Sequence, residues 1–409
     1  MTELAVSAQI FPAPWPGEAA ISLSAKPDRS WRPYCSRKAR YLDPDGRERS
    51  KAFPRKADAE KFLTQVGADL LRGSYLDPDA GKVTLRRYAE RWQATRSWDA
   101  STRQTMEYRI ARYILPVLGD KQLDQLARQP SLISGWAAGL RVSAQTASQA
   151  LSALSSIMSA AVDDGLVSRN PCRAGSVRAP RVQRRKVIPW TTAQVAAVRA
   201  ALDARHEAMA DCGAGLGLRQ GEIFGLTLDA VDFLRRTVRV RVQVRLVGNR
   251  AVFAPPKGGR ERDVPLPGPV SAALASHLKQ FPARPVPLPW LEPGGKPRTE
   301  TLVFTTVRGL AFHRTTFNDE VWRPARKAAG LPNDRENGMH ALRHHYASIL
   351  LAGGVDIRAV SEYLGHHDPA FTLRIYAHLM PGADDRARRA VEKALAAQQG
   401  GLESHATEA

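Results

Sequence analysis

Residues 340–376 read HALRHHYASILLAGGVDIRAVSEYLGHHDPAFTLRIY, and the spacing of their apolar residues and glycines predicts three consecutive helices. The first helix begins near His340 and ends at Gly353-Gly354, because tandem glycine is a poor helix interior and a good helix end. The second covers residues 357–364 and runs into Gly365, and the third completes the stretch. The stretch therefore predicts a mainly helical carboxyl-terminal domain.

Ionisable side chains share one face of the first predicted helix. His340, Arg343 and His344 are three and four residues apart, so they lie on the same side of a helix. Packing alone does not favour such a group. A zinc site of the His-Glu-x-x-His type would need a carboxylate at position 341, which is alanine. The pattern favours an anion-binding site over a metal site. The opposite face is apolar and carries Leu342, Tyr346, Ile349 and Leu350.

Composition restricts the class of partner. The chain has 409 residues, 60 Lys and Arg against 40 Asp and Glu, a net charge of +20 and 43% hydrophobic residues. This length predicts two or three folded domains, and the basic excess favours a polyanion, either nucleic acid or an acidic membrane surface. Apolar runs of membrane-spanning length and a signal peptide are absent, which favours nucleic acid and a cytoplasmic location. The scattered Cys35, Cys172 and Cys212 argue against disulfides and structural zinc.

The amino-terminal half reads as two small domains behind a tail. Residues 1–25 predict a disordered tail. Residues 26–75 predict a small domain in which three short strands precede a helix at 56–71. Residues 83–167 then show apolar residues at helical spacing and predict an all-α domain. The expected strands of the first domain cover residues 31–34, 40–42 and 50–53.

Residues 168–186 form the most basic segment of the chain. They contain seven Arg and Lys residues and no acid, with proline, glycine and small residues between them. A solvated linker is the plain interpretation, but uncompensated cations are attracted to nucleic acid phosphates. The segment therefore predicts a DNA-binding hinge. Its candidate DNA-binding residues are Arg178, Arg181, Arg184, Arg185 and Lys186.

Residues 187–398 predict a mainly helical domain with a small antiparallel sheet, and residues 399–409 a tail. Residues 235–245 alternate as one strand with a basic face, and the chain then returns toward Lys257 at a hairpin tip. Residues 282–297 predict a proline-rich loop. The whole chain is therefore expected to be a multidomain α+β protein, with a three-stranded β plus helix domain, an all-α domain and this mainly α domain.

Four motifs resemble those of one known family. His340-x-x-Arg343, Leu364-Gly365-His366 and Tyr376 are similar to the carboxyl-terminal signature of the tyrosine recombinases, the phage integrase family. The segments 215–222 and 256–266 resemble its regions around the first arginine and the lysine hairpin. The resemblance covers about residues 26–397. It implies an arm-type DNA-binding domain at 26–75, a core-binding domain at 83–167 and a catalytic domain at 187–398.

The resemblance implies six catalytic residues. Tyr376 would be the nucleophile that forms a 3′-phosphotyrosyl bond, and Lys257 would protonate the 5′ oxygen. His340 would contact the phosphate and take the tyrosine proton. His344, like the other remaining histidines, matches no fixed catalytic position and is interpreted as structural or secondary. The six implied residues are Arg219, Lys257, His340, Arg343, His366 and Tyr376.

The implied reaction is site-specific integration or excision of a phage or mobile element without a cofactor, metal or ATP. Its implied partners are double-stranded DNA attachment sites, a homotetramer on synapsed DNA, a directionality factor and a host DNA-bending protein, with no membrane. Two alternatives are retained, of which the first shares the tyrosine chemistry and the second would be expected to lack one or more of the six residues. One is a type IB topoisomerase-like enzyme, and the other is a catalytically inert DNA-binding regulator.

Overall fold

The structure is a computed structural model that describes residues 37–73, 75, 77, 79–182, 186–379, 388, 391, 392 and 395. It divides into two compact units, which we describe separately. Unit one comprises Met1–Ser97 and Met106–Val182, and unit two comprises Trp98–Thr105 and Gln183–Ala409. The expected tails, the strand at 31–34, Arg184 and Arg185 lie outside the described residues.

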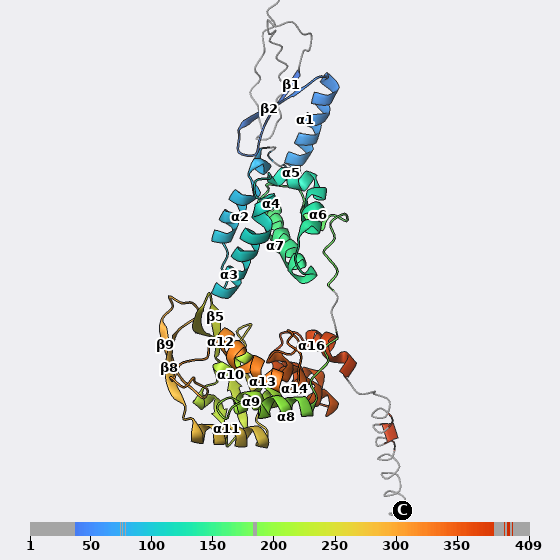
Figure 1. Cartoon of the computed structure of the whole chain (residues 1–409). Helices are drawn as coiled ribbons and strands as arrows, with labels where there is room; N and C mark the ends of the chain where they lie inside the picture. The colour runs from blue at the N-terminus through green and yellow to red at the C-terminus, as the bar shows by residue number, and fades with distance from the viewer. Residues whose placement is uncertain are drawn as a thin grey trace, which may run out of the picture. The chain divides into compact units, whose positions relative to one another are not determined.

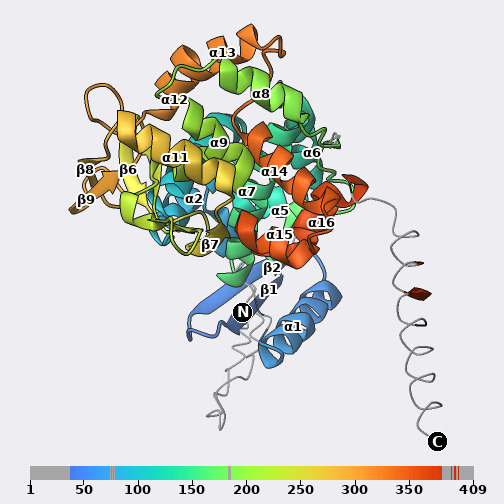
Figure 2. The same ribbon diagram turned by 90° about the horizontal axis from the view of Figure 1, so that it is seen from below.

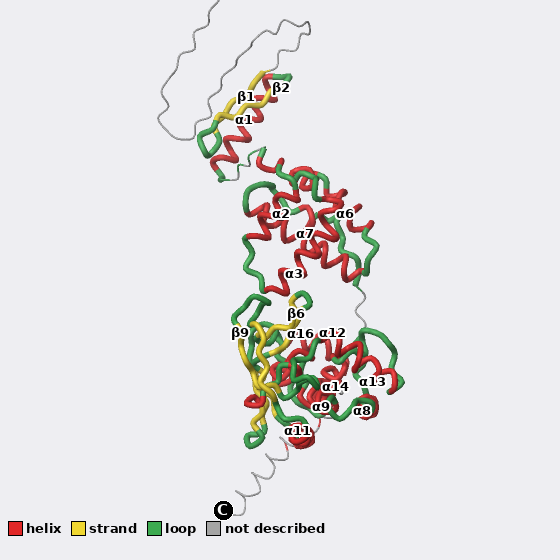
Figure 3. The backbone as a smooth tube through the Cα atoms, turned by 60° about the vertical axis from the view of Figure 1, so that its left-hand side comes forward, coloured by secondary structure: helices red, strands yellow, loops and turns green. Residues whose placement is uncertain are grey.

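A β-hairpin packed on a helix forms the first part of unit one (Figure 3). Strand β1 (Arg37–Leu42) pairs antiparallel with β2 (Glu48–Phe53), in a register that places Tyr41 opposite Arg49. Helix α1 (Lys56–Leu71) buries Ala59, Leu63 and Val66 against Ala39 and Tyr41. The described residues thus confirm the helix at 56–71 and two of the three expected strands.

Helices make up the rest of unit one. The longest, α7 (Ala144–Asp163), buries Leu151, Leu154 and Met158 at helical spacing, as the sequence predicts. Ser143 caps it by accepting a hydrogen bond from the backbone N–H of Thr146. The preceding helices are α2 (Leu85–Ala94), α4 (Leu115–Leu118), α5 (Leu123–Arg128) and α6 (Pro130–Gly139), with a π-helical turn at Ile110–Ile114. Helix α3 (Ala100–Arg109) is divided, with its first residues in unit two and its residues from Met106 in unit one.

Unit two is a helical domain with small antiparallel sheets (Figure 1). Its first helices are α8 (Thr192–Ala200), α9 (Glu207–Leu216), α10 (Gln220–Phe224), α11 (Gly268–Gln280), α12 (Arg314–Phe317) and α13 (Arg323–Ala328). The predicted helices of residues 340–376 are confirmed as α14 (His340–Ala352), α15 (Ile357–Leu364) and α16 (Pro369–Tyr376).

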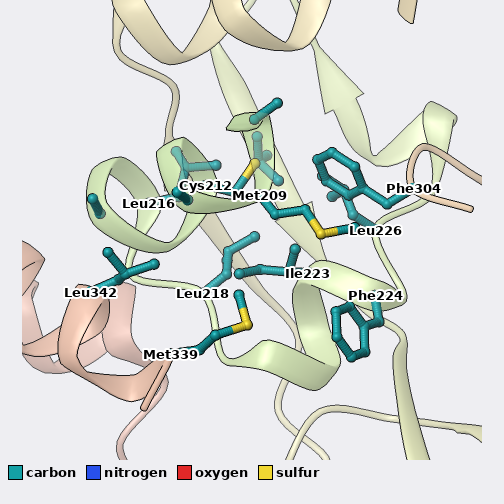
Figure 4. Close-up of a cluster of buried hydrophobic side chains, with 14 of the residues drawn as sticks. Met209, Cys212, Leu216, Leu218, Ile223, Phe224, Leu226, Phe304, Met339 and Leu342 are labelled. Atoms are coloured by element: carbon teal, nitrogen blue, oxygen red, sulfur yellow. The ribbon is translucent and has the colours of Figure 1, made fainter. Parts of the chain in front are cut away.

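The central core of unit two lies between α9 and α14 (Figure 4). Cys212 and Leu216 of α9 face Leu342 of α14, and all three are buried. Ile223 and Phe224 of α10 extend the same cluster. Burial of Leu342 fixes α14 on the core, whereas Ile349, expected on the same apolar face, is exposed, and Arg343, expected on the opposite face, is fully buried. Helix α15 packs against both α14 and α16, and Figure 2 shows the three helices together.

The expected single strand at residues 235–245 is wrong. The chain forms β4 (Thr237–Val240) and then β5 (Gln243–Val247), which belong to different sheets. Val240 pairs with Arg262, the first residue of β7 (Arg262–Pro265), so β4 loses its partner there. Strand β5 pairs instead with β6 (Arg250–Ala254), and the two-residue β3 (Val231–Asp232) completes the first sheet.

The basic side chains of this segment are also paired with acids. Arg239 bonds Glu261 at 3.1 Å and Arg241 bonds Asp229 at 2.5 Å. Their charge is thereby offset, so the expected basic strand face is not a free cationic surface.

The expected proline-rich loop at residues 282–297 is also wrong in part. Strand β8 (Arg284–Pro289) pairs antiparallel with β9 (Pro297–Leu302). Its prolines alternate with Val286 and Leu288. Residues two apart point their N–H groups to the same edge of a strand. Prolines at this spacing therefore remove N–H donors from one edge only, and the other edge can still pair. Buried Val286 then fixes the hairpin to the core.

In the part of the chain that the structure describes, no helix combines the length and apolar character needed to cross a membrane.

Candidate active site

Arg343 is fully buried on α14, at the carboxyl-terminal ends of two other helices. Its Nη1 donates to the Gly217 carbonyl at 2.7 Å, and its Nη2 donates to the Leu364 carbonyl. Carbonyl groups at helix ends carry partial negative charge, which stabilises a cation there. The Nε of Arg343 is buried and has no hydrogen-bond partner among the described residues. Burial, followed by the charge of Arg219, lowers the pKa of Arg343 to about 9.

Glycine is required at the end of α9 for this arrangement. Gly217 has a left-handed φ of 62°, and a Cβ atom there would lie 2.3 Å from the ring of Tyr346. Gly365 ends α15 in the same way, with a φ of 61°. The two turns bring the carbonyl groups of residues 217 and 364 to the same guanidinium group.

Arg219 lies at the start of α10 and is held by a buried carboxylate. Glu222 accepts from the Arg219 backbone N–H and from its Nη1, both at 2.8 Å. The Nη2 of Arg219 donates to the Gly365 carbonyl at 3.2 Å. Arg219 and Arg343 therefore bond the carbonyls of successive residues, Gly365 and Leu364. This places two guanidinium groups next to each other, in the arrangement that recognises phosphate.

Glu222 also bonds a second arginine. Arg262 donates to both of its carboxylate oxygens, at 3.0 and 2.7 Å, and donates through Nε to the Tyr363 carbonyl at 2.7 Å. Burial by itself would raise the pKa of Glu222, but the bonds of Arg262 and the charges of Arg219 and Arg343 lower it to about 2. Glu222 is therefore ionised and links α10, β7 and the end of α15.

His366 follows Gly365 and is fixed through both ring nitrogens. Its Nε2 lies 3.1 Å from Arg343 Nη2, and its Nδ1 lies 2.8 Å from the Thr372 hydroxyl. Since arginine can only donate, Nε2 is the acceptor and Nδ1 carries the proton. Burial and the charge of Arg343 lower the pKa of His366 to about 3, so the ring is neutral.

Tyr376, the last residue of α16, is 1% exposed and lies beside this cluster. Its hydroxyl is 2.7 Å from Nδ1 of His344. Burial raises the pKa of Tyr376 to about 12, although the charges of Arg343 and Arg219 oppose the rise. The ring of His340 contacts that of His344 edge to face, at 4.8 Å between centroids. The pKa of His340 is lowered by partial loss of solvation around its ring and by its neighbours His344 and Arg343, although the residue as a whole is exposed.

Lys257 is exposed on the turn between β6 and β7. The turn is closed by a hydrogen bond from Gly259 N–H to the Pro256 carbonyl at 2.8 Å. Lys257, Arg219 and His340 all line one open hollow of unit two. The exposed lysine thus lines the same hollow as Arg219, whereas Arg343 and Tyr376 are buried.

The described linker residues Arg178, Arg181 and Lys186 are exposed. In the described part of the chain, no group of three His, Cys, Asp or Glu side chains is arranged to hold a metal ion.

The sequence patterns did not identify two parts of the site. His344, interpreted as structural or secondary, makes the hydrogen bond to Tyr376, and Arg262 shares Glu222 with Arg219. The spacing of four between His340 and His344 already placed these two on one helical face. No local signal reveals that Arg262 bonds Glu222, because the two are 40 residues apart in the sequence.

Comparisons with known proteins give one family. The profile of the phage integrase family matches residues 191–382, and that of the phage integrase central domain matches residues 85–176. The putative prophage phiRv2 integrase of Mycobacterium tuberculosis is 29% identical over 357 residues, covering 85% of this chain and 89% of that protein. The integrase of Mycobacterium phage L5 is 26% identical over 369 residues, covering 87% and 94%.

Solved structures show the same fold. The Tn1549 transposon integrase, in complex with transposon right end DNA, aligns with a TM-score of 0.63 and 21% identity. The alignment covers 76% of this chain and 99% of that one. A lambda integrase tetramer bound to a Holliday junction aligns with a TM-score of 0.52 and 17% identity, covering 84% and 92%.

Proposed function

Since the chain belongs to the phage integrase family of tyrosine recombinases and is a site-specific recombinase, we propose that it cuts and rejoins DNA through a 3′-phosphotyrosyl bond on Tyr376. One observation carries the assignment of residues. Arg219 and Arg343 bond the carbonyls of neighbouring residues, and Tyr376 is buried beside them, close enough for both charges to act on its pKa.

The two arginines would bind the non-bridging oxygens of the scissile phosphate. Guanidinium forks match phosphate oxygens and keep their charge, so they stabilise the charge that develops during transfer. The unpartnered Nε of Arg343 supports this role, because a buried donor without an acceptor is costly and a phosphate oxygen would satisfy it. His340 would add a contact to the phosphate, and His366, whose Nε2 is bonded to Arg343, would contact the phosphate only by exchanging that bond.

Strand cleavage forms the bond between Tyr376 Oη and phosphorus and breaks the bond between phosphorus and the 5′ oxygen. Lys257 would give that oxygen a proton as general acid, which its place in the hollow beside Arg219 and His340 supports. The 5′ hydroxyl of a partner strand then attacks the phosphotyrosyl bond and releases Tyr376. One phosphoester replaces another in each step, so no ATP is consumed.

DNA is the partner of this family, and we assign the parts of the chain accordingly. Residues 26–75 would bind arm-type sites, residues 83–167 would bind the core site, and Arg178, Arg181 and Lys186 would contact phosphates from the linker. The solved lambda integrase tetramer on a Holliday junction supports a homotetramer on two synapsed attachment sites. A directionality factor and a host DNA-bending protein would complete the assembly.

The test uses a nicked suicide duplex, built from the direct repeats that bracket the mobile element carrying this gene. Full-length protein in EDTA is expected to form a protein–DNA adduct that survives SDS, because cleavage near the nick lets the cut fragment diffuse away. Tight binding of the duplex without any adduct would contradict the proposal and favour an inert DNA-binding regulator. An adduct that requires added Mg²⁺ would contradict the metal-free chemistry.

Substitution of Lys257 by alanine tests the general acid. We expect about a 10²–10⁴-fold slower cleavage of the normal duplex. A duplex with sulfur at the 5′ bridging position should restore the rate, because a thiol titrates near ~8.5 and its thiolate leaves without a proton. Lys296→Ala, on the turn between β8 and β9, is the matched control and should cleave both duplexes normally. Equal defects of Lys257→Ala on the two duplexes would contradict the role.

A further inference from the structure

The hydroxyl of Tyr376 is bonded to a histidine outside the six residues that the family resemblance implies. His344 lies on α14, one turn after His340, and its Nδ1 is 2.7 Å from Tyr376 Oη. Tyr376 is 1% exposed, so bulk water has little access to this hydroxyl. A nucleophilic tyrosine must lose its proton, and the group that receives the proton must lie within hydrogen-bond reach.

We propose that His344 is a catalytic base, which takes the hydroxyl proton of Tyr376 during cleavage and returns it during ligation. This inference rests on the proposed function, because it requires Tyr376 to be the nucleophile.

The protonation states of the pair agree with the direction of transfer. Burial, followed by the charge of Arg343, lowers the pKa of His344 to about 4, so its ring is neutral at pH 7. The raised pKa of Tyr376 means that the phenol keeps its proton. Both groups are therefore neutral, and in the tautomer that carries the imidazole proton on Nε2 the tyrosine O–H donates to Nδ1. This is the arrangement of a nucleophile and its base before reaction.

The neighbouring histidines are less suited to this task. His366 has its Nε2 bonded to Arg343 and its Nδ1 bonded to Thr372, so both of its nitrogens are already used. His340 lines the open hollow together with Lys257, which places it toward the phosphate. Two further histidines bond backbone carbonyls, with His345 Nδ1 on Trp190 and His378 Nε2 on Val187.

The transfer balances in atoms and charge. As the Tyr376 oxygen bonds phosphorus, its proton moves to Nδ1, and His344 becomes an imidazolium. The 5′ oxygen leaves with a proton from Lys257, which becomes a neutral amine. In ligation the incoming 5′ hydroxyl returns its proton to Lys257, and His344 returns its own to Tyr376.

The surroundings of His344 make the transfer depend on DNA. The groups that face it are His340 and Arg343 on α14, Tyr376 on α16 and His366 after α15. His378, in the turn after α16, is directed to the Val187 carbonyl instead. An imidazolium beside Arg343 is unfavourable until an anion offsets the charge. A bound phosphate supplies that charge, so Tyr376 is expected to be activated only when DNA is in place.

The experiment compares His344→Ala and His344→Asn with wild type on the suicide duplex that carries the 5′ bridging sulfur. This duplex removes the requirement for Lys257 and isolates deprotonation of the tyrosine. Asparagine keeps an acceptor oxygen near the position of Nδ1 but is not a base. Both variants are expected to cleave about 10²–10⁴-fold more slowly, with unchanged DNA binding. His367→Ala, an exposed neighbour of the site, is the control and should cleave at the wild-type rate.

The pH dependence separates a base from a residue that only positions Tyr376. Between pH 6 and 9 the wild-type rate should be level, because His344 stays neutral. The rate of His344→Ala should rise about tenfold per pH unit as hydroxide replaces the missing base. A wild-type rate in His344→Asn, or a rate in His344→Ala that does not change with pH, would overturn this inference. The wild type would still form its adduct in that case, so the proposed function would stand. The absence of an adduct in the wild type would overturn the proposed function itself.

Discussion

Replacing Tyr376 with phenylalanine is expected to abolish the protein–DNA adduct and leave DNA binding intact. The substitution removes only the hydroxyl, which is the atom that would bond phosphorus. The ring keeps its place, because the side chain is buried at the end of α16 and phenylalanine fills nearly the same volume. One hydrogen bond, to His344, is lost, so the free energy of unfolding should fall by only about 1 kcal/mol.

A second buried tyrosine of the same domain provides the matched control. Tyr346 lies on α14, with 4% of its surface exposed, and its ring packs on Gly217. Tyr346→Phe should form the adduct at close to the wild-type rate. The measurement is the fraction of labelled suicide duplex that is shifted on an SDS gel, with binding measured by gel mobility shift. An adduct in Tyr376→Phe would show that the nucleophile is another residue.

Replacing Glu222 with glutamine is expected to lower both the stability of unit two and the rate of cleavage. The carboxylate bonds Arg219 and Arg262, and the Arg262 side chain is almost as buried as Glu222 itself. A neutral amide leaves these buried guanidinium groups without their counter-charge. Removing one partner of a buried ion pair lowers the free energy of unfolding by about 3–5 kcal/mol. Cleavage should slow as well, because Arg219 loses the group that orients it.

Scanning calorimetry of the full chain, with and without the substitution, would measure the shift of the transition that belongs to unit two. Glu261→Gln is the control, since Glu261 forms an exposed pair with Arg239 and should change stability by less than about 1 kcal/mol. A shift for Glu222→Gln no larger than that of the control would contradict the structural role of the carboxylate.

The contribution of the Glu222 carboxylate to the stability of unit two should also depend on pH. Its pKa is lowered from the ordinary 4.5 to about 2, so the unfolded chain binds this proton more readily than the folded chain. The stabilisation is therefore fully present above pH 4.5 and is lost as the pH falls toward 2. The difference in transition temperature between wild type and Glu222→Gln should accordingly be level above about pH 5 and narrow in acid. A difference in transition temperature that stays constant down to pH 2 would show that the charge of the Glu222 carboxylate does not supply the stabilisation.

Elements that are governed by local rules could be predicted from the residues alone. The helices at 340–352, 357–364 and 369–376 follow from apolar spacing and from glycines at their ends, which act over a few residues. The helix at 56–71 and the buried face of α7 have the same origin. The family resemblance likewise depended on short motifs, and the family is confirmed.

Contacts between distant segments could not be predicted from the sequence, because they depend on how the whole domain packs. The strand at 235–245 divides in two because β7 begins opposite Val240, and β8 forms despite its prolines because β9 pairs with its free edge. Glu222 meets Arg262 across 40 residues, and Tyr376 meets His344 across 32. Pairing of strand edges and sharing of a buried charge depend on which segments are brought together by burial of the core. Short motifs in the sequence therefore predicted six candidate residues, and the packing of α14, α15 and α16 placed a further histidine, His344, against Tyr376.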